Sequence, residues 1–231
     1  MKIYTMSQRS DEWYSVRRGK FTASEFGELM PSGKQGIGEW NKTQMRIIYR
    51  VTAEIMTGKT VGNTYVSQAM QHGIDTEAEA RIAFELETGM EVKTVGFVEW
   101  NEWIGCSPDG LIPDSGLEIK CPQSDTHLRY LNSPADLSAD YEWQCIGGML
   151  CAGVKTWHLY SFDPRFSDST HQSLHVTINY DEEKEKCLIA RLGQAIIVVR
   201  SLIERMGGSP FWIAKRAEPG MTGEIEAETE G

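Results

Sequence analysis

The chain has 231 residues, 40% of them hydrophobic, and a formal net charge of −10. This length suits one α/β domain with insertions and is sufficient to bury a sizeable core. No run of about 18 apolar residues is present, which excludes a transmembrane helix, and the N-terminus lacks the apolar block of a signal peptide, so we expect a cytoplasmic protein with no membrane partner.

The charge is unevenly distributed along the chain. Residues 1–60 hold ten Lys or Arg against six Asp or Glu, whereas the segment after Arg216 holds five Glu and no cation. A negative net charge argues against a nucleic-acid partner, but an acidic metal site contributes negative charge of its own, so charge does not decide the function. We expect one domain over residues 1–217 and a disordered acidic tail over residues 218–231.

Two short helices are expected near the N-terminus. Ser10 is a favourable N-cap for a helix that Gly19 ends, and Thr22 with Glu25 has capping-box spacing for a second helix. Free N–H groups at such a helix start, with Arg17 nearby, could hold a phosphate. Taken alone, these residues are more simply explained by an ordinary cap beside a solvated arginine.

A glycine-rich loop over residues 31–39 precedes a predicted helix over residues 41–57. The loop lacks the Gly-Lys-Ser/Thr ending of a phosphate-binding P-loop. One face of the helix carries Lys42, Arg46 and Arg50 at spacings of four residues. This basic stripe could face a DNA backbone, although a solvated helix face is the commoner explanation.

A long helix is predicted over residues 67–88. Glu77 lies in a partly apolar row of this helix, which is an unusual place for a carboxylate without a partner. His72 is more simply structural than a metal ligand, because no second His lies at metal spacing. The apolar periodicity and turn residues predict the remaining elements, which are strands over 92–97, 103–106 and 116–121, helices over 124–132 and 139–152, strands over 156–163 and 174–180, and a helix over 181–206.

The turn after Asp109 brings together three charged residues. Residues 111–116 form a strand end and a turn rich in Pro, Asp, Ser and Gly, so a hairpin folds Asp109 back beside Glu118. Glu118 and Lys120 point to the same face of the following strand. Two carboxylates and one ammonium group suit metal-assisted attack on a phosphodiester. The motif is short, however, and taken alone an exposed turn with a solvated Glu–Lys pair is the commoner explanation.

Five segments in order resemble the phage lambda exonuclease family of 5′-end DNA exonucleases, also called alkaline exonucleases. They are Trp13–Gly19 with Thr22–Glu25, His72–Arg81, Ser107–Gly110, Leu117–Pro122, and Tyr141–Gln144 with Phe162–Arg165. The resemblance implies a restriction-endonuclease-like PD-(D/E)xK core, an α/β fold with a central mixed β-sheet flanked by helices. It also implies a phage or prophage origin, and hence the cytoplasm of a bacterial host cell.

The resemblance assigns roles to particular residues. The implied metal-binding groups are Asp109, Glu118, Glu77 and the backbone carbonyl of Ile119. Lys120 resembles the lysine that positions the attacking water, and Gln144 resembles the active-site glutamine. The implied groups that hold the terminal 5′-phosphate are Arg17, Thr22, Ser24 and Ser107. Met70 falls where the family has an apolar wedge that separates the two DNA strands.

The implied activity is Mg²⁺-dependent 5′-to-3′ degradation of linear double-stranded DNA from a 5′-phosphate end. The products are 5′-mononucleotides and a 3′ overhang for recombination by strand annealing, with two metal ions in each site and Mn²⁺ as a substitute. The implied partners are DNA ends, two further copies in a homotrimeric ring, and a single-strand annealing protein.

Three alternatives remain open. A restriction-type endonuclease shares the core and the motif, and a catalytically silent DNA-binding module could retain the same fold. A RecB/Cas4-type nuclease needs four cysteines for an iron–sulfur cluster. The five cysteines of this chain include no Cys-x-x-Cys pair, and this predicts reduced thiols rather than a cluster, a zinc site or a disulfide framework.

Overall fold

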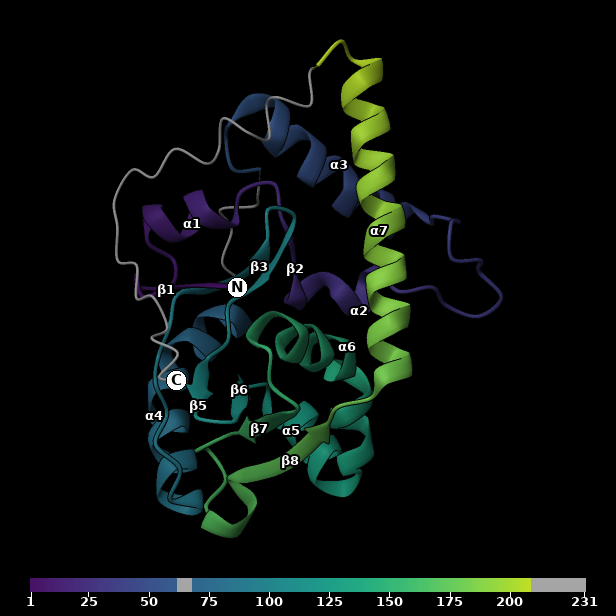
Figure 1. Cartoon of the computed structure of the whole chain (residues 1–231). Coiled ribbons are helices and arrows are strands. Elements are labelled where there is room, and N and C mark those ends of the chain that lie inside the picture. The colour runs from purple at the N-terminus through teal and green to yellow at the C-terminus, as the bar shows by residue number, and fades with distance from the viewer. Residues whose placement is uncertain (62–67, 209–231) are drawn as a thin grey trace, which may run out of the picture.

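The computed structural model describes residues 1–61 and 68–208, with side chains from residue 71 onward in the second segment. The expected acidic tail, residues 218–231, lies outside this part of the chain. The elements in chain order are β1 (Lys2–Tyr4), α1 (Asp11–Arg17), β2 (Phe21–Thr22), the 3₁₀ turn η1 (Ala23–Glu25), α2 (Phe26–Leu29), α3 (Lys42–Thr57), α4 (Gln68–Thr88), β3 (Phe97–Asn101), β4 (Ile104–Cys106), β5 (Gly110–Ile112), β6 (Ser115–Lys120), α5 (Ser124–Asn132), α6 (Pro134–Ala152), β7 (Thr156–Phe162), η2 (Ser169–His171), β8 (Ser173–Asn179) and α7 (Glu182–Arg205) (Figure 1).

The strands form two four-stranded mixed sheets, in the orders β1-β3-β4-β2 and β5-β6-β7-β8. The pairs β2–β4 and β6–β7 are parallel, and the other pairs are antiparallel. The predicted α/β class is therefore confirmed, but two sheets take the place of the single central sheet. None of the described helices is long and apolar enough to cross a membrane.

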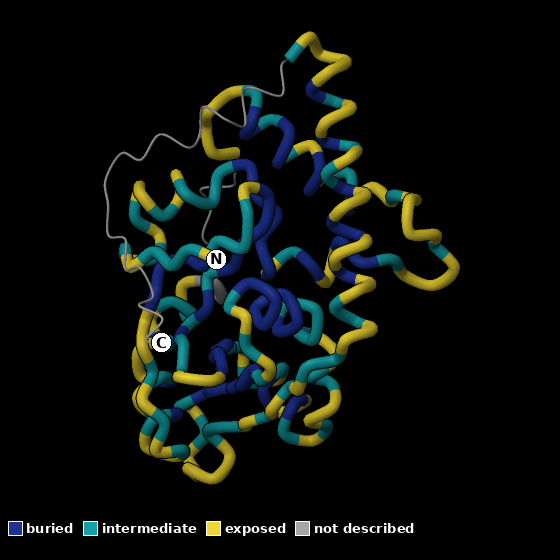
Figure 2. Tube along the Cα trace, in the orientation of Figure 1, coloured by how far each residue is buried: buried dark blue, intermediate teal, exposed yellow. Residues whose placement is uncertain are grey.

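Helix α6 lies at the centre of the molecule, and its C-terminal half is buried from Cys145 to Cys151 (Figure 2). Two successive glycines let its neighbours approach closely. A Cβ on Gly147 would lie 2.4 Å from the Phe26 ring, and a Cβ on Gly148 would lie 2.6 Å from the Trp157 ring. These contacts, with a further one of 3.2 Å between the Gly147 position and Ala23 Cβ, pack α2 and the 3₁₀ turn η1 against one side of α6 and strand β7 against another. Both η1 and β7 border the candidate site.

Strand β6 is covered by a different helix on each face. Leu117 packs in a cluster with Ala80 and Phe84 of α4, whereas Glu118 faces α6, where it contacts Gln144. The alternation of side chains along a strand explains this division. The apolar residues of β6 anchor α4, and its two charged residues, Glu118 and Lys120, are presented on the α6 side.

Helix α7 runs along one side of the molecule and packs against α3 and α6 (Figure 1). Its predicted core row is confirmed, because the residues at this spacing are buried or partly buried. They are Leu188, Leu192, Ile196, Val199 and Ile203. Beside this row, the buried Arg191 donates from Nε to the carbonyl oxygen of Leu29 at 2.8 Å, and its guanidinium group stacks on the Trp40 ring at 3.6 Å.

Two predicted helix starts differ from the structure. The segment after Thr22 is a 3₁₀ turn followed by the four-residue helix α2, and the Thr22 side chain caps neither. Its hydroxyl instead donates to the Glu25 carboxylate at 3.1 Å. Helix α6 starts at Pro134, five residues before the predicted start at Ala139, because proline at the first helical position fits the unpaired N–H groups of a helix start.

The predicted basic stripe of α3 contacts the protein itself. Arg50 pairs with Glu25 at 2.7 Å and with Glu54 at 2.8 Å, and the exposed Arg46 pairs with Glu28 at 3.0 Å. The Glu54 carboxylate also accepts the backbone N–H of Gly19 at 2.6 Å. Much of this stripe therefore fixes the α1–β2 connection and η1 on α3.

The packing of Gly148 against Trp157 generates a stability prediction. Gly148→Ala should lower the free energy of unfolding by about 1–3 kcal/mol, the usual cost of overpacking a core. Gly193→Ala is the control, because a Cβ there meets no atom within 4 Å, and alanine in a helix interior should raise stability by about 0.5–1 kcal/mol. Urea unfolding measures both changes, and equal stability of the two variants would contradict the packing argument.

Candidate active site

The β5–β6 hairpin brings the predicted carboxylates together. Its strands pair in the register Gly110 to Leu117, and the Asp109 N–H donates to the Leu117 carbonyl oxygen at 3.1 Å. The Asp109 carboxylate in turn accepts the N–H of Ile119 through Oδ2 at 2.7 Å. Asp109 is therefore fixed beside the residue that follows Glu118, as the hairpin prediction required.

Glu118, Lys120 and Gln144 form one hydrogen-bonded group. Glu118 Oε1 accepts from Lys120 Nζ at 2.7 Å and from Gln144 Nε2 at 2.5 Å. Lys120 Nζ also donates to Gln144 Oε1 at 3.2 Å and lies 4.4 Å from the centre of the Tyr141 ring. An ammonium group has three N–H donors, so one remains to bind a water molecule or a phosphate oxygen.

The electrostatics of this group favour a cationic ligand. Burial, together with the negative charges of Glu118 and Glu77, raises the pKa of Asp109 well above its usual range, and this outweighs the opposing effects of Lys120 and the Ile119 N–H. Burial lowers the pKa of Lys120, but the Glu118 and Asp109 carboxylates outweigh it and raise this pKa above its ordinary value. Lys120 is therefore protonated and positively charged in the metal-free protein.

Glu77 has the charged partners that its place in a partly apolar row predicted. Its Oε1 accepts from Arg81 at 3.0 Å, and its Oε2 accepts from Arg9 at 3.4 Å. Its charge acts on Asp109, so α4 brings a third carboxylate toward the site. Met70 lies in α4, but its side chain is outside the described residues, so its role as a wedge stays a prediction.

Arg17, Ser107 and Trp13 form a second group. Ser107 Oγ accepts from Arg17 Nη1 and from Trp13 Nε1, each at 2.9 Å, and the Arg17 guanidinium lies 4.2 Å from the Trp13 ring centre. Both lone pairs of the Ser107 hydroxyl are thereby used, so its proton remains for an external acceptor. Burial lowers the pKa of Arg17 to about 10, which leaves it charged at neutral pH. The group suits an anion.

The other two predicted phosphate ligands, Ser24 and Thr22, differ in whether they line the pocket. Ser24 is exposed and lines the same pocket as Arg17, whereas Thr22 is buried. Thr22 Oγ1 accepts from Arg17 Nη2 at 3.3 Å and lies 3.4 Å from Ser24 Oγ. Thr22 therefore positions Arg17 and Ser24 and is not itself among the residues that line the pocket.

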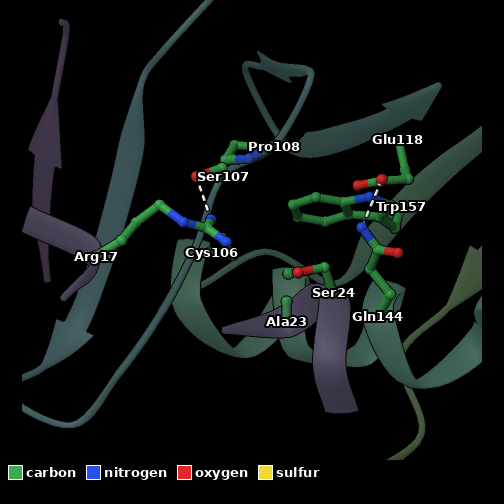
Figure 3. Close-up of a pocket in the computed structure, with 10 residues that line it drawn as sticks. Arg17, Ala23, Ser24, Cys106, Ser107, Pro108, Glu118, Gln144 and Trp157 are labelled. Atoms are coloured by element: carbon green, nitrogen blue, oxygen red, sulfur yellow. Dashed lines mark hydrogen bonds between the residues drawn. The ribbon is translucent and has the colours of Figure 1, made fainter. Parts of the chain in front are cut away.

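One pocket joins the two groups. Figure 3 shows Arg17 and Ser107 at one end and Glu118 and Gln144 at the other, with Ser24 between them. The Trp157 ring forms part of the wall. The donors of Arg17 and Ser107 therefore face the same space as the Glu118 carboxylate. Glu118 belongs, with Asp109 and Lys120, to what we call the carboxylate–lysine group; Asp109 and Lys120 do not themselves line this pocket.

The carboxylates fit a divalent cation that is shared with a substrate. Among residues 1–61 and 68–208, no three His, Cys, Asp or Glu side chains converge to hold a metal ion by themselves. Mg²⁺ commonly uses only one or two carboxylates and completes its shell with phosphate oxygens and water. Burial, and then the charges of Glu118 and Glu77, raise the pKa of Asp109, and such an ion would offset these negative charges. Glu77 and the Ile119 carbonyl remain predicted ligands.

Three residues that the structure places at the site had no role assigned from the sequence. Trp13 lies one helical turn before Arg17, and Tyr141 lies one turn before Gln144, so helical spacing was a usable signal for both. Arg9 reaches Glu77 from 68 positions away, and no local pattern predicts this contact.

Known proteins resemble this chain in sequence and fold. Residues 12–155 match the YqaJ-like viral recombinase domain, and no match is found among curated proteins.

Solved structures of exonucleases share the fold. The structure of an alkaline exonuclease, LHK-Exo from Laribacter hongkongensis, matches this chain with a TM-score of 0.72 and 26% sequence identity, over 86% of this chain and 98% of that one. The same values hold for LHK-Exo in complex with dAMP. A phage-related exonuclease from Haemophilus somnus 129PT shares the fold, with a TM-score of 0.68 at 16% identity, over 84% and 99% of the two chains. These matches confirm the predicted PD-(D/E)xK-like fold class.

The raised pKa of Asp109 predicts that its charge destabilises the metal-free protein. A carboxyl with a raised folded-state pKa loses its stabilising contribution as the pH rises through that pKa. Asp109→Asn should therefore raise Tm at pH 8 in EDTA by about 2–4 °C, the shift for roughly 1 kcal/mol in a chain of this size. The difference should shrink as the pH falls toward about 4, the ordinary pKa of Asp.

Asp114→Asn, in the exposed turn of the same hairpin, is the matched control and should change Tm little. Added Mg²⁺ should raise Tm of the wild type and of the Asp114 variant more than that of the Asp109 variant. A lower Tm of Asp109→Asn in EDTA would contradict the electrostatic argument.

Proposed function

This chain belongs to the YqaJ-like viral recombinase family and is a nuclease that acts on DNA, and from that premise we propose that it degrades linear double-stranded DNA from a 5′-phosphate end. The proposed direction is 5′ to 3′, with release of 5′-mononucleotides and a 3′ single strand left for recombination by annealing. The proposed setting is the cytoplasm of a bacterial cell that carries phage or prophage DNA.

The single observation that carries this proposal is the pocket shared by Arg17, Ser107 and Glu118. A terminal phosphate bound by the guanidinium and hydroxyl groups leaves the first phosphodiester to reach the carboxylate–lysine group. Hydrolysis of its O3′–P bond releases one nucleotide with its 5′-phosphate. The shortened strand again ends in a 5′-phosphate, so the same pocket can accept it in the next cycle.

The residues of the hydrogen-bonded group have distinct roles in this reaction. Lys120 is held by Glu118 and Gln144, and its remaining N–H orients the attacking water and stabilises negative charge on the phosphate. Gln144 fixes the Glu118 carboxylate through a 2.5 Å hydrogen bond. Asp109 and Glu118, with Glu77 and the Ile119 carbonyl as further ligands, would hold Mg²⁺, or Mn²⁺ in its place, with two ions in each site.

A bound divalent cation supplies a more acidic water and offsets charge on the phosphate oxygens. The complex of LHK-Exo with dAMP, a mononucleotide, supports mononucleotide release here. A homotrimeric ring around the duplex and a single-strand annealing partner complete the proposal.

The phosphate pocket predicts a preference among DNA ends. Linear duplex with 5′-phosphate ends should be degraded at least about tenfold faster than the same duplex with 5′-hydroxyl ends, because a hydrogen bond to a charged group contributes about 1.5–3 kcal/mol. Release of the labelled 5′-terminal nucleotide in Mg²⁺, with an EDTA control, measures this ratio. Arg17→Lys keeps the charge but loses the planar fork, so the ratio should fall.

Equal rates from the two kinds of end would overturn the role of the pocket. A covalently closed circular duplex should stay intact in the same assay. Cutting of the circle would favour the restriction-type endonuclease, and no cutting of any DNA would favour the silent binding module.

The carboxylate–lysine group predicts that removal of the Lys120 charge strongly lowers the rate of DNA degradation. Lys120→Ala should lower the rate at saturating DNA by about 100-fold or more, as loss of a donor to a developing oxyanion does, while binding of a 5′-phosphate duplex in EDTA persists. Lys186→Ala, on the exposed side of α7, is the matched control and should keep the wild-type rate. Retained degradation by the Lys120 variant would overturn its assignment.

A further inference from the structure

Arg9 has an unusual backbone for its residue type. Its φ is +69°, and among the residues that the structure describes it is the non-glycine residue with a positive φ. The left-handed region crowds a Cβ against the following carbonyl oxygen and is adopted freely by glycine. Such strain in a non-glycine residue persists where the surroundings impose it, and it gathers at functional sites.

The surroundings of Arg9 do impose this conformation. Gln8 Nε2 donates to the carbonyl oxygen of Pro108 at 2.9 Å and to that of Val95 at 3.3 Å. On the other side, Ser10 N–H donates to the Ser7 carbonyl oxygen at 3.3 Å, and the Ser10 hydroxyl caps α1. The segment is therefore attached to the residue that immediately precedes Asp109.

The Arg9 side chain ends at the carboxylate group of the site. Its Nη2 lies 3.4 Å from Glu77 Oε2, and Arg81 holds the other oxygen of the same carboxylate. Two guanidinium groups thus share one carboxylate, so the two arginines carry one positive charge more than Glu77 neutralises. The Arg9 side chain is 45% exposed, so its other N–H donors can reach a ligand from solvent.

The contact with Glu77 does not by itself explain an arginine here. It is long, and an ion pair with an exposed partner contributes little to stability. Glycine would adopt this positive φ with less strain, and Arg81 already neutralises Glu77. These contacts give no reason for an arginine at this position, so we look for the reason in a ligand outside the chain. An anion such as phosphate can accept two parallel N–H bonds from one guanidinium group.

We propose that Arg9 binds an internal phosphate of the DNA strand being degraded, on the α4 side of Asp109, across the cleavage centre from the Arg17 pocket. This inference rests on the proposed nuclease function, because it takes its ligand from that substrate. Arg17 then holds the terminal phosphate on the α6 side, and Arg9 holds the strand beyond the scissile bond. Arg81 keeps Glu77 in place while Arg9 turns to the phosphate.

The test measures binding without turnover. A fluorescent duplex with one 5′-phosphate end is titrated in EDTA at several KCl concentrations with the wild type, Arg9→Gln, Arg9→Gly and Arg46→Gln. Arg46 is the matched control, since it is an exposed arginine of α3 that is paired with Glu28 of α2. The Arg9 variants should bind several-fold more weakly, and the slope of log K against log [KCl] should fall in magnitude by about 0.7–0.9, the value for one phosphate contact. Arg46→Gln should keep the wild-type slope.

Two further measurements separate this role from its rivals. Arg9→Gly should have a Tm equal to or above that of the wild type, because glycine relieves the backbone; a clearly lower Tm would indicate a structural role and overturn the proposal. With a 5′-hydroxyl duplex the effect of Arg9→Gln should persist, whereas that of Arg17→Lys should disappear. Loss of the Arg9 effect on this duplex would place Arg9 at the terminal phosphate and overturn the internal site.

An unchanged salt slope in both Arg9 variants, with DNA binding retained, would also overturn the inference while leaving the proposed function intact. A wild-type protein that neither binds nor degrades duplex ends would instead overturn the proposed function, and the inference with it.

Discussion

The hydrogen bond from the Ile119 N–H to the Asp109 carboxylate is the constraint on which the site depends. It closes the hairpin across its two strands and fixes one carboxylate against the backbone that carries the other. Because side chains alternate along β6, the same strand then directs Glu118 and Lys120 together toward α6. A peptide N–H cannot change its place without loss of the strand pairing, so the separation of the charged groups is set by backbone rather than by flexible side chains.

The rest of the fold compensates for the charges that this constraint brings together. Ionised Asp109 is unfavourable beside Glu118 in the metal-free protein, so the elements around it must be held by other means. The close contact of α6 with the Trp157 ring holds one wall, and the pairing of Arg50 with Glu25 and Glu54 holds the other. A substrate and its cation meet a site that is already assembled, which lowers the cost of ordering it on binding.

How much could be predicted from the sequence depended on how local the interactions are. The hairpin and helix α3 are set by residues a few positions apart, and both were predicted correctly, although Asn41 is the N-cap of α3 rather than its first residue. Arg50 pairs with Glu54 on its own helix and with Glu25 on another element, and no local pattern predicts the contact with Glu25. Arg9 and Glu77 meet across 68 positions, and the division into two sheets depends on long-range pairing that no window of sequence contains. The phosphate pocket was found through resemblance, since its residues alone favoured an ordinary cap.

The exposed two-residue turn of the β5–β6 hairpin, Pro113 and Asp114, lies at the end of the strand pair remote from Asp109. Residues added at this tip would lengthen the loop and leave the pairing of Gly110 with Leu117 untouched. One residue added within β6 would instead rotate Glu118 and Lys120 onto the face that packs against α4. Evolution and protein engineering can therefore vary the distance in sequence between the two carboxylates freely at the tip, whereas the spacing from Leu117 to Lys120 admits no change in length.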